Sequence, residues 1–249
     1  MKRYLRLFGN VADWWKHLAV KAGIHREDPV VFHLRNGVTM EVPLILYHEF
    51  KEIFLEDCYL QGFEKPLPDS PIVVDIGANA GFFCLQIASH RPKARILCCE
   101  PIPVNFKQLS RNAAINPNLD ITAQQVAVYG HTGSMQLLVE WEDALSTAAT
   151  ILPVGGRIPM EVPCVNLQDL LDRHGLDRVD LLKLDCEGSE YSILYRCTAE
   201  YLKRIGKMAI EVHAGQEPDH NITALSSFLA ARGFSTHTAG YMLWAVSPD

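Results

Sequence analysis

The sequence lacks the features that mark several large classes of protein. Its seven cysteines form no C-x-x-C pair and no metal-type spacing, which predicts reduced thiols in a cytoplasmic setting and no metal site. No apolar run reaches the length of a membrane span. Asp13, Lys16 and His17 interrupt any apolar signal core near the N-terminus. The sequence therefore predicts neither secretion nor a transmembrane anchor.

Basic residues are also fewer than acidic ones. The chain has 23 Lys and Arg and 29 Asp and Glu, which gives a net charge of -6. This balance argues against nucleic acid as a partner. The charge is uneven, because residues 1–26 carry six basic side chains and one acid, Asp13. Two interpretations of this Trp-containing segment stay open. Its apolar side packs on the domain as a helix over 11–22, or it contacts an anionic membrane surface.

The chain shows no repeat and no low-complexity run, and the positions of its turn and proline residues suggest two parts. Residues 1–70 contain a hairpin signal at Asn36-Gly37 between expected strands 30–34 and 38–46, then a helical stretch 47–60 and a proline-rich linker. These elements have too few apolar residues for a core of their own. We expect them to form a lid or wall on a domain spanning residues 71–249.

Residues 71–249 alternate between strand and helix patterns, which predicts a mostly parallel sheet with helices on both faces. The final two strands share a short turn at Gly240 and must be antiparallel. Asp219 is the expected N-cap of the last helix. Residues 140–160 are expected to be irregular. The expected strands are 72–76, 94–99, 121–129, 134–139, 161–165, 179–185, 208–213, 234–238 and 241–246, and the expected helices begin near 80, 103, 167, 189 and 219.

A glycine-containing turn, V-D-I-G-A-N-A-G over residues 74–81, follows the first strand of this domain. Gly77 and Gly81 allow close approach of a ligand to the backbone, and Asp75 is placed to accept a hydrogen bond from a ligand amine. The G-x-x-x-G spacing is not the dinucleotide fingerprint G-x-G-x-x-G. Glu100 ends the next strand, 25 residues after Asp75, where an acid can hold the hydroxyls of a ribose.

Charged side chains also gather at two later strand ends. Lys183, Asp185 and Glu187 surround the end of strand 179–185, while Glu211 and His213 share one face of strand 208–213. Ligands of open α/β sheets bind outside the carboxyl ends of the strands. These five residues are therefore candidates for catalysis, with a structural ion pair of Lys183 and a structural His213 as the alternatives.

The blocks VVDIGANAGFF, CCEPIPVNFKQLSRNAAIN, VDLLKLDCEGSEYSIL and MAIEVH together resemble the FkbM family of S-adenosylmethionine-dependent methyltransferases over roughly residues 72–235. The resemblance implies a class I methyltransferase Rossmann-like fold, with a seven-stranded, mostly parallel sheet whose last strand is antiparallel. It also implies O-methylation of a hydroxyl on a sugar, glycan, lipid or natural product. By position, the implied cofactor-binding residues are Asp75, Gly77, Ala78, Asn79, Gly81, Glu100, Pro101 and Ala127.

An alcohol needs a base to become a good methyl acceptor. His213, which can be neutral near pH 7, is the leading candidate, and Asp185 is the rival. Asp185, Glu187 and Glu211 could in principle gather a divalent cation. Two other functions stay open: a non-catalytic cofactor-binding or interaction module, and a nucleotide-dependent oxidoreductase, although the latter requires the fingerprint that this chain lacks.

Overall fold

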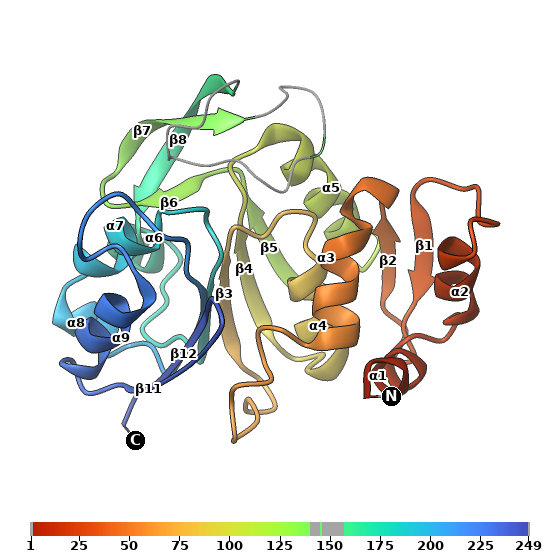
Figure 1. Ribbon diagram of the computed structural model, residues 1–249, viewed down its shortest axis with the longest axis horizontal. Helices are drawn as coiled ribbons and strands as arrows, with labels where there is room; N and C mark the ends of the chain where they lie inside the picture. The colour runs from red at the N-terminus through yellow and green to blue at the C-terminus, as the bar shows by residue number, and fades with distance from the viewer. Residues whose placement is uncertain (1, 140–144, 146–156, 249) are drawn as a thin grey trace.

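The computed structural model describes residues 2–139, 145 and 157–248, and its central feature is a seven-stranded sheet (Figure 1). The strand order is β11-β12-β10-β9-β3-β4-β5. β12 is antiparallel to both of its neighbours, while β10, β9, β3, β4 and β5 run parallel. This is the expected class I methyltransferase arrangement. The strands are β3 (Ile72–Ile76), β4 (Arg95–Cys99), β5 (Asp120–Gln124), β9 (Leu181–Leu184), β10 (Lys207–Glu211), β11 (Ser235–Ala239) and β12 (Met242–Val246).

Helices cover both faces of the sheet, as a run of buried parallel strands requires. Alternate residues of β3 serve the two faces: Val73 packs in one core with α4 and α5, and Val74 packs in a second core with α6, α7, α8 and α9. Both valines are 0% exposed. The helices are α4 (Phe82–His90), α5 (Pro103–Ala114), α6 (Leu167–Arg173), α7 (Glu190–Tyr195), α8 (Ala199–Leu202) and α9 (Ile222–Ala230).

The N-terminal elements lie beside α4 and α5, at the right of Figure 1. Phe50 and Phe54 are fully buried in the same core as Phe83 of α4, so this region shares its core with the sheet. The expected hairpin is present. The elements are α1 (Lys2–Asn10), α2 (Trp15–Lys21), β1 (Val30–His33), β2 (Thr39–Val42), the 3-10 helix η1 (Leu44–Leu46), α3 (Tyr47–Lys51) and the π-helical turn η2 (Glu52–Glu56).

The helix expected over residues 11–22 is shorter and faces another way. It begins at Trp15, while Val11 forms a β-bridge with Leu34. Trp15 and Leu18, expected to pack inward, are 55% and 40% exposed. The buried position of α2 is instead His17, whose Nδ1 lies 2.7 Å from the hydroxyl of Tyr47. The preceding helix α1 was not expected from the sequence.

Three more expectations need correction or fall outside the description. The strand expected over 121–129 is two strands, because its second half joins a separate sheet of order β6-β8-β7. The N-cap of α9 is Asn221 rather than Asp219, since its side chain accepts from the backbone of Ala224. The irregular segment expected at 140–160 lies mostly outside the described residues. The second sheet comprises β6 (Ala127–Tyr129), β7 (Gly133–Val139) and β8 (Ile158–Asn166).

The expectation of uniformly reduced cysteines is wrong for one pair. Cys84 on α4 and Cys98 on β4 are joined by a disulfide, whereas the other five cysteines are free. The pair unites a helix with the neighbouring strand across a buried interface, a proximity that a spacing of 14 residues did not reveal. As for membranes, none of the helices in the described part of the chain is long and apolar enough to span one.

Candidate active site

The turn after β3 is held rigidly by backbone bonds. The N–H groups of Gly77 and Ala78 both donate to the carbonyl of Cys99, at 3.0 Å. Gly77 has φ 76°, and a Cβ there would lie 1.8 Å from the carbonyl oxygen of Asp185. Only glycine permits this close crossing of two strand ends. Asn79 is also left-handed, with φ 47°.

Glu100, at the end of β4, fixes this turn from the other side. Its carboxylate accepts from the backbone N–H groups of Asn79 and Ile102, each at 2.9 Å. Burial raises the pKa of Glu100 to about 7, although the two amides oppose the rise. Because each carboxylate oxygen has a second lone pair, Glu100 can still accept hydrogen bonds from a ligand.

Glu100 borders a cavity, here called the strand-end cavity, which lies outside the carboxyl ends of β3, β4 and β9. Gly77, Asn79 and Ala127 lie on its wall, together with a mostly apolar set from β6 and its surroundings. Its lining residues are Ile76, Gly77, Asn79, Cys99, Glu100, Pro101, Ile102, Asn105, Val126, Ala127, Val128, Leu137, Asp185, Cys186, Glu187 and Ser189.

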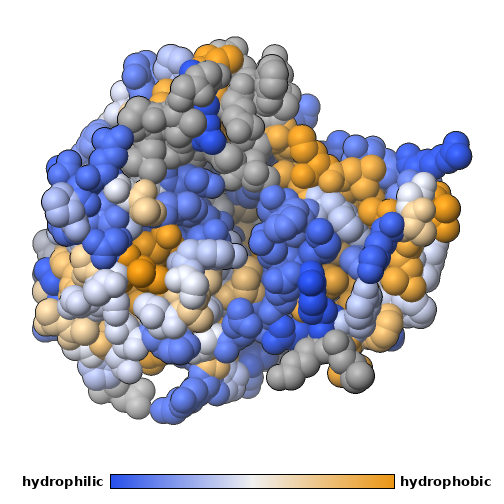
Figure 2. Space-filling view, viewed as in Figure 1, coloured by the Kyte–Doolittle hydropathy of each residue, from blue (hydrophilic) through white to orange (hydrophobic). Residues whose placement is uncertain are grey.

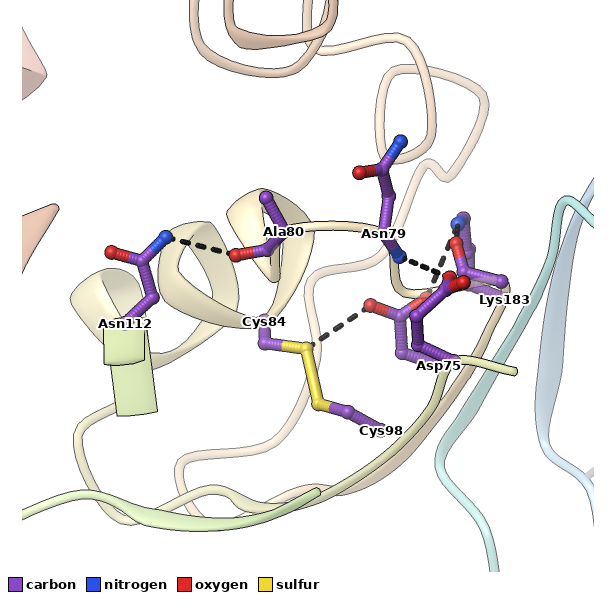
Figure 3. The surroundings of a disulfide bond; sticks show 9 residues. Asp75, Asn79, Ala80, Cys84, Cys98, Asn112 and Lys183 are labelled. Carbon is purple, nitrogen blue, oxygen red and sulfur yellow. Dashed lines mark hydrogen bonds and ion pairs between the residues drawn. A yellow bond between two sulfur atoms is a disulfide. The ribbon is translucent and has the colours of Figure 1, made fainter. Parts of the chain in front are cut away.

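Asp75 and Lys183 form an ion pair beneath the turn (Figure 3). They stand opposite each other on β3 and β9, with Lys183 Nζ 3.2 Å from Asp75 Oδ1 and 2.8 Å from the carbonyl oxygen of Gly77. Both side chains are almost fully buried. Burial lowers the pKa of Lys183, but the charges of Asp75 and Asp185 outweigh this and keep it above its ordinary value. Asp75 is thus the ion-pair partner of Lys183 and does not line the strand-end cavity.

A second cavity of about 220 Å³, here called the acidic cavity, adjoins the first. The two share Gly77, Asn79, Asp185 and Glu187. Five carboxylates and one amine, Lys183, line it among the described residues. Its lining residues are Glu49, Glu52, Ile53, Tyr59, Gly77, Ala78, Asn79, Ala80, Phe82, Phe83, Lys183, Asp185, Glu187 and Glu211.

Tyr59 links the N-terminal region to these carboxylates. Its hydroxyl donates to Asp185 at 2.7 Å and lies 3.3 Å from a carboxylate oxygen of Glu211. Burial raises the pKa of Tyr59 well above its ordinary value, so it acts as a hydrogen-bond donor. Burial, then the charge of Asp185, raises the pKa of Glu211 to about 7. Trp244 Nε1 donates to the carbonyl of Tyr59 and fixes its backbone.

His213 is held by a buried carboxylate. Its Nδ1 lies 2.9 Å from Glu190, which is 0% exposed, and its Nε2 lies 3.7 Å from Glu187 and 4.0 Å from Glu211. Burial opposes the charged ring, but the hydrogen bond and charge of Glu190 outweigh burial and raise the pKa of His213 to about 9. These contacts favour the protonated ring of His213 over the neutral one near pH 7.

Asp185, Glu211 and His213 also have ligand atoms within 4.8 Å of one another, a grouping that could suit a metal ion. In this arrangement, however, Asp185 already accepts from Tyr59 and pairs with Lys183 at 3.4 Å. The carboxylate of Asp185 thus already has two partners within the chain.

The structure brings most of the sequence-predicted residues to these two cavities. Five of the eight cofactor candidates line the strand-end cavity, Ala78 lines the acidic one, and Asp75 and Gly81 line neither. Gly81 instead packs against Leu109. Four further residues at the site were not predicted from the sequence: Tyr59, Glu49, Glu52 and Glu190. A further cavity of about 580 Å³ lies elsewhere, beside α1 and the C-terminal end of α4, and none of the candidate residues lines it.

Comparison with known proteins identifies the family of this chain. Residues 75–236 match the methyltransferase FkbM domain family. Methyltransferase sdnD of Sordaria araneosa is 30% identical over 74% of this chain and 80% of its own length. The 31-O-demethyl-FK506 methyltransferase FkbM of Streptomyces tacrolimicus is 26% identical over 75% of this chain and 80% of its own length.

Among solved structures, a methyltransferase FkbM from Methylobacillus flagellatus superposes with a TM-score of 0.51 and 19% identity over 81% of this chain. The chain spans half the length of that structure, so this likeness concerns the fold. Family membership counts against the oxidoreductase hypothesis. The chain belongs to the FkbM methyltransferase family and is a methyltransferase.

Proposed function

We propose that this protein transfers a methyl group from S-adenosylmethionine to a hydroxyl of a sugar, glycan, lipid or natural product. The observation that carries the proposal is the common wall of the two cavities, formed by Gly77, Asn79, Asp185 and Glu187. A donor in one cavity and an acceptor in the other would meet at this wall. Holding two reactants in line is worth up to about 7–11 kcal/mol in favourable cases.

The strand-end cavity suits the donor. Glu100 offers a fixed carboxylate to the two hydroxyls of a ribose, and Asn79 lies beside it. Ala127, Val128 and Leu137 provide apolar contact for a base. When bound, S-adenosylmethionine supplies an activated methyl group on a sulfonium, and the chain binds, orients and excludes water.

The acidic cavity suits the acceptor. Glu49, Glu52 and Tyr59 contribute one wall, so we assign residues 1–70 the role of acceptor wall rather than that of a separate domain. Five carboxylates against one amine repel anions, and we therefore expect neutral or cationic hydroxyl compounds rather than phosphorylated or carboxylated ones. The name of the Streptomyces relative places its reaction at an oxygen, which supports an O-linked product here.

The hydroxyl proton must pass to the protein as the methyl group arrives. We assign this role to the carboxylate pair of Asp185 and Glu211, because the raised pKa of His213 leaves its ring protonated at neutral pH. Glu211, with a pKa of about 7, is matched to proton transfer near neutrality. His213 then stabilises the negative charge of Glu187 and Glu211.

The test is methyl transfer from isotopically labelled S-adenosylmethionine to a panel of neutral, amino and phosphorylated hydroxyl compounds. Label in an alkali-stable ether of a neutral or amino compound supports the proposal. Asp185→Asn should lower kcat at least about a hundredfold. Exposed Glu200→Gln is the control.

The pH profile separates the two bases. A rise of kcat through an apparent pKa near 7 supports the carboxylates, whereas a rise near 9 assigns the base to His213. Binding of S-adenosylhomocysteine without transfer to any compound would favour the non-catalytic module. Labelled product at nitrogen or carbon would refute O-methylation.

A further inference from the structure

Exposed apolar side chains are concentrated near the N-terminus. Of the eleven large apolar residues that are exposed in the described part of the chain, eight lie between residues 4 and 45. The most exposed are Ile24 at 71% and Leu5 and Ile45 at 63% each. In Figure 2 the N-terminal part, at the right, shows apolar surface interleaved with hydrophilic surface. Scattered single residues of this kind are ordinary, but a concentration in one region marks an interaction site.

Five of these residues lie on α1 or α2, and a sixth, Ile24, lies three residues after the end of α2. Lys21 Nζ donates to the hydroxyl of Tyr4 at 3.0 Å. The rings of Phe8 and Trp14, the residue before α2, pack edge to face with their centroids 4.9 Å apart. The two helices therefore lie close to each other. We call the six exposed residues the N-terminal surface: Tyr4, Leu5, Phe8, Trp15, Leu18 and Ile24.

The charge of this region is opposite to that of the rest of the chain. Residues 1–26 carry +5, which leaves -11 for the remainder of a total of -6. The single acid, Asp13, is paired with Lys16 at 2.7 Å. Arg3, Lys21 and Arg26 are exposed. Arg3 pairs with Glu56 only at the exposed surface, where such pairs contribute little.

We propose that the N-terminal surface docks on an anionic lipid bilayer. Apolar and aromatic side chains alternating with basic ones on adjacent short helices are the composition of interfacial membrane contacts. Exposed lysines and arginines are drawn to the negative surface potential of anionic lipids. A second copy of the chain fits less well, because it would bring two positively charged surfaces together. This inference does not depend on the identity of the methyl acceptor.

The test is co-sedimentation of the full-length protein with vesicles of phosphatidylcholine, with and without phosphatidylglycerol. We expect binding only with phosphatidylglycerol, weakened by salt. Arg3→Gln, Lys21→Gln and Arg26→Gln combined should weaken binding about a hundredfold.

An apolar variant, Leu5→Ser, Trp15→Ser and Leu18→Ser combined, should also weaken binding at least tenfold. Circular dichroism and the thermal midpoint confirm that it is folded. The matched control replaces two residues exposed elsewhere, Ile115→Ser and Tyr241→Ser, and should bind as wild type.

Equal binding to both vesicle types, or equal loss in the control, overturns the proposal. So does a wild-type dimer in light scattering that the apolar variant converts to monomer while neither form binds vesicles, since the surface would then be an interface between copies.

Discussion

Replacing Glu190 with glutamine removes the buried charge that keeps a proton on His213. The pKa of His213 rises from 6.5 to about 9 because the bond to Glu190, at 2.9 Å, outweighs burial of the ring. At about 1.4 kcal/mol per pKa unit, this shift stabilises the folded protein by about 3 kcal/mol. The folded-state pKa lies above the unfolded one. The stabilisation is therefore complete below pH 6.5 and is lost as the pH rises through about 9.

The assay is NMR titration of the His213 ring in wild type and Glu190→Gln, together with urea unfolding across the same pH range. We expect the variant ring to titrate at least about one pKa unit lower, and its unfolding free energy to fall less steeply between pH 6.5 and about 9. Glu187→Gln is the matched control, because it leaves the Nδ1 bond intact while removing a charge 3.7 Å from Nε2. The same His213 pKa in Glu190→Gln and wild type would refute the reasoning.

Three further substitutions test the architecture of the site. Gly77→Ala forces a Cβ against Asp185 and should destabilise the fold by more than about 2 kcal/mol in urea unfolding, whereas Gly37→Ala, with a similar positive φ but open space, should cost less. Lys183→Met leaves Asp75 buried without its cation and should cost about 3–5 kcal/mol in the same assay; unchanged stability would contradict the ion pair. Glu100→Gln places an amide against two backbone donors and should weaken S-adenosylhomocysteine binding at least about tenfold by calorimetry, and wild-type affinity would remove Glu100 from the donor site.

The sheet was predictable because its signals are local. Mostly apolar runs such as residues 72–76 indicate strands buried on both faces, and proline at 103 marks the first turn of α5. The break after residue 124 was not predictable, because nothing in the local pattern tells which sheet a strand joins. The buried face of α2 was predicted wrongly because a polar residue, His17, occupies the buried position. Its ring is tolerated there because it forms a hydrogen bond with the hydroxyl of Tyr47.

The strand-end residues of the site followed from their position in the sequence, but their partners did not. Tyr59 reaches Asp185 across 126 residues, and no spacing rule foresees that contact. Glu190 is an acid in the first turn of α7, a position that is common for acids and gives no sign of a role at the site. It is fully buried beside His213, and its hydrogen bond to the ring raises the pKa of His213. Electrostatics at such a site is a tertiary property, which explains why the residue types could be predicted from the sequence while the partners of His213 could not.

The charges of the site also explain why so many carboxylates can coexist there. Lys183 balances Asp75 and Asp185, while His213 balances Glu190 and Glu187. Glu211 stands between the two groups, 3.3 Å from the Tyr59 hydroxyl and 4.0 Å from His213 Nε2. Transfer of a methyl group from a sulfonium to an alcohol consumes one positive charge and releases one proton. A carboxylate with a pKa near 7, flanked by fixed cations, can hold that proton and return it to water. On this argument Glu211→Gln should abolish the rise in kcat near pH 7 while leaving binding of S-adenosylhomocysteine intact, and an unchanged pH profile would transfer the role to Asp185 alone.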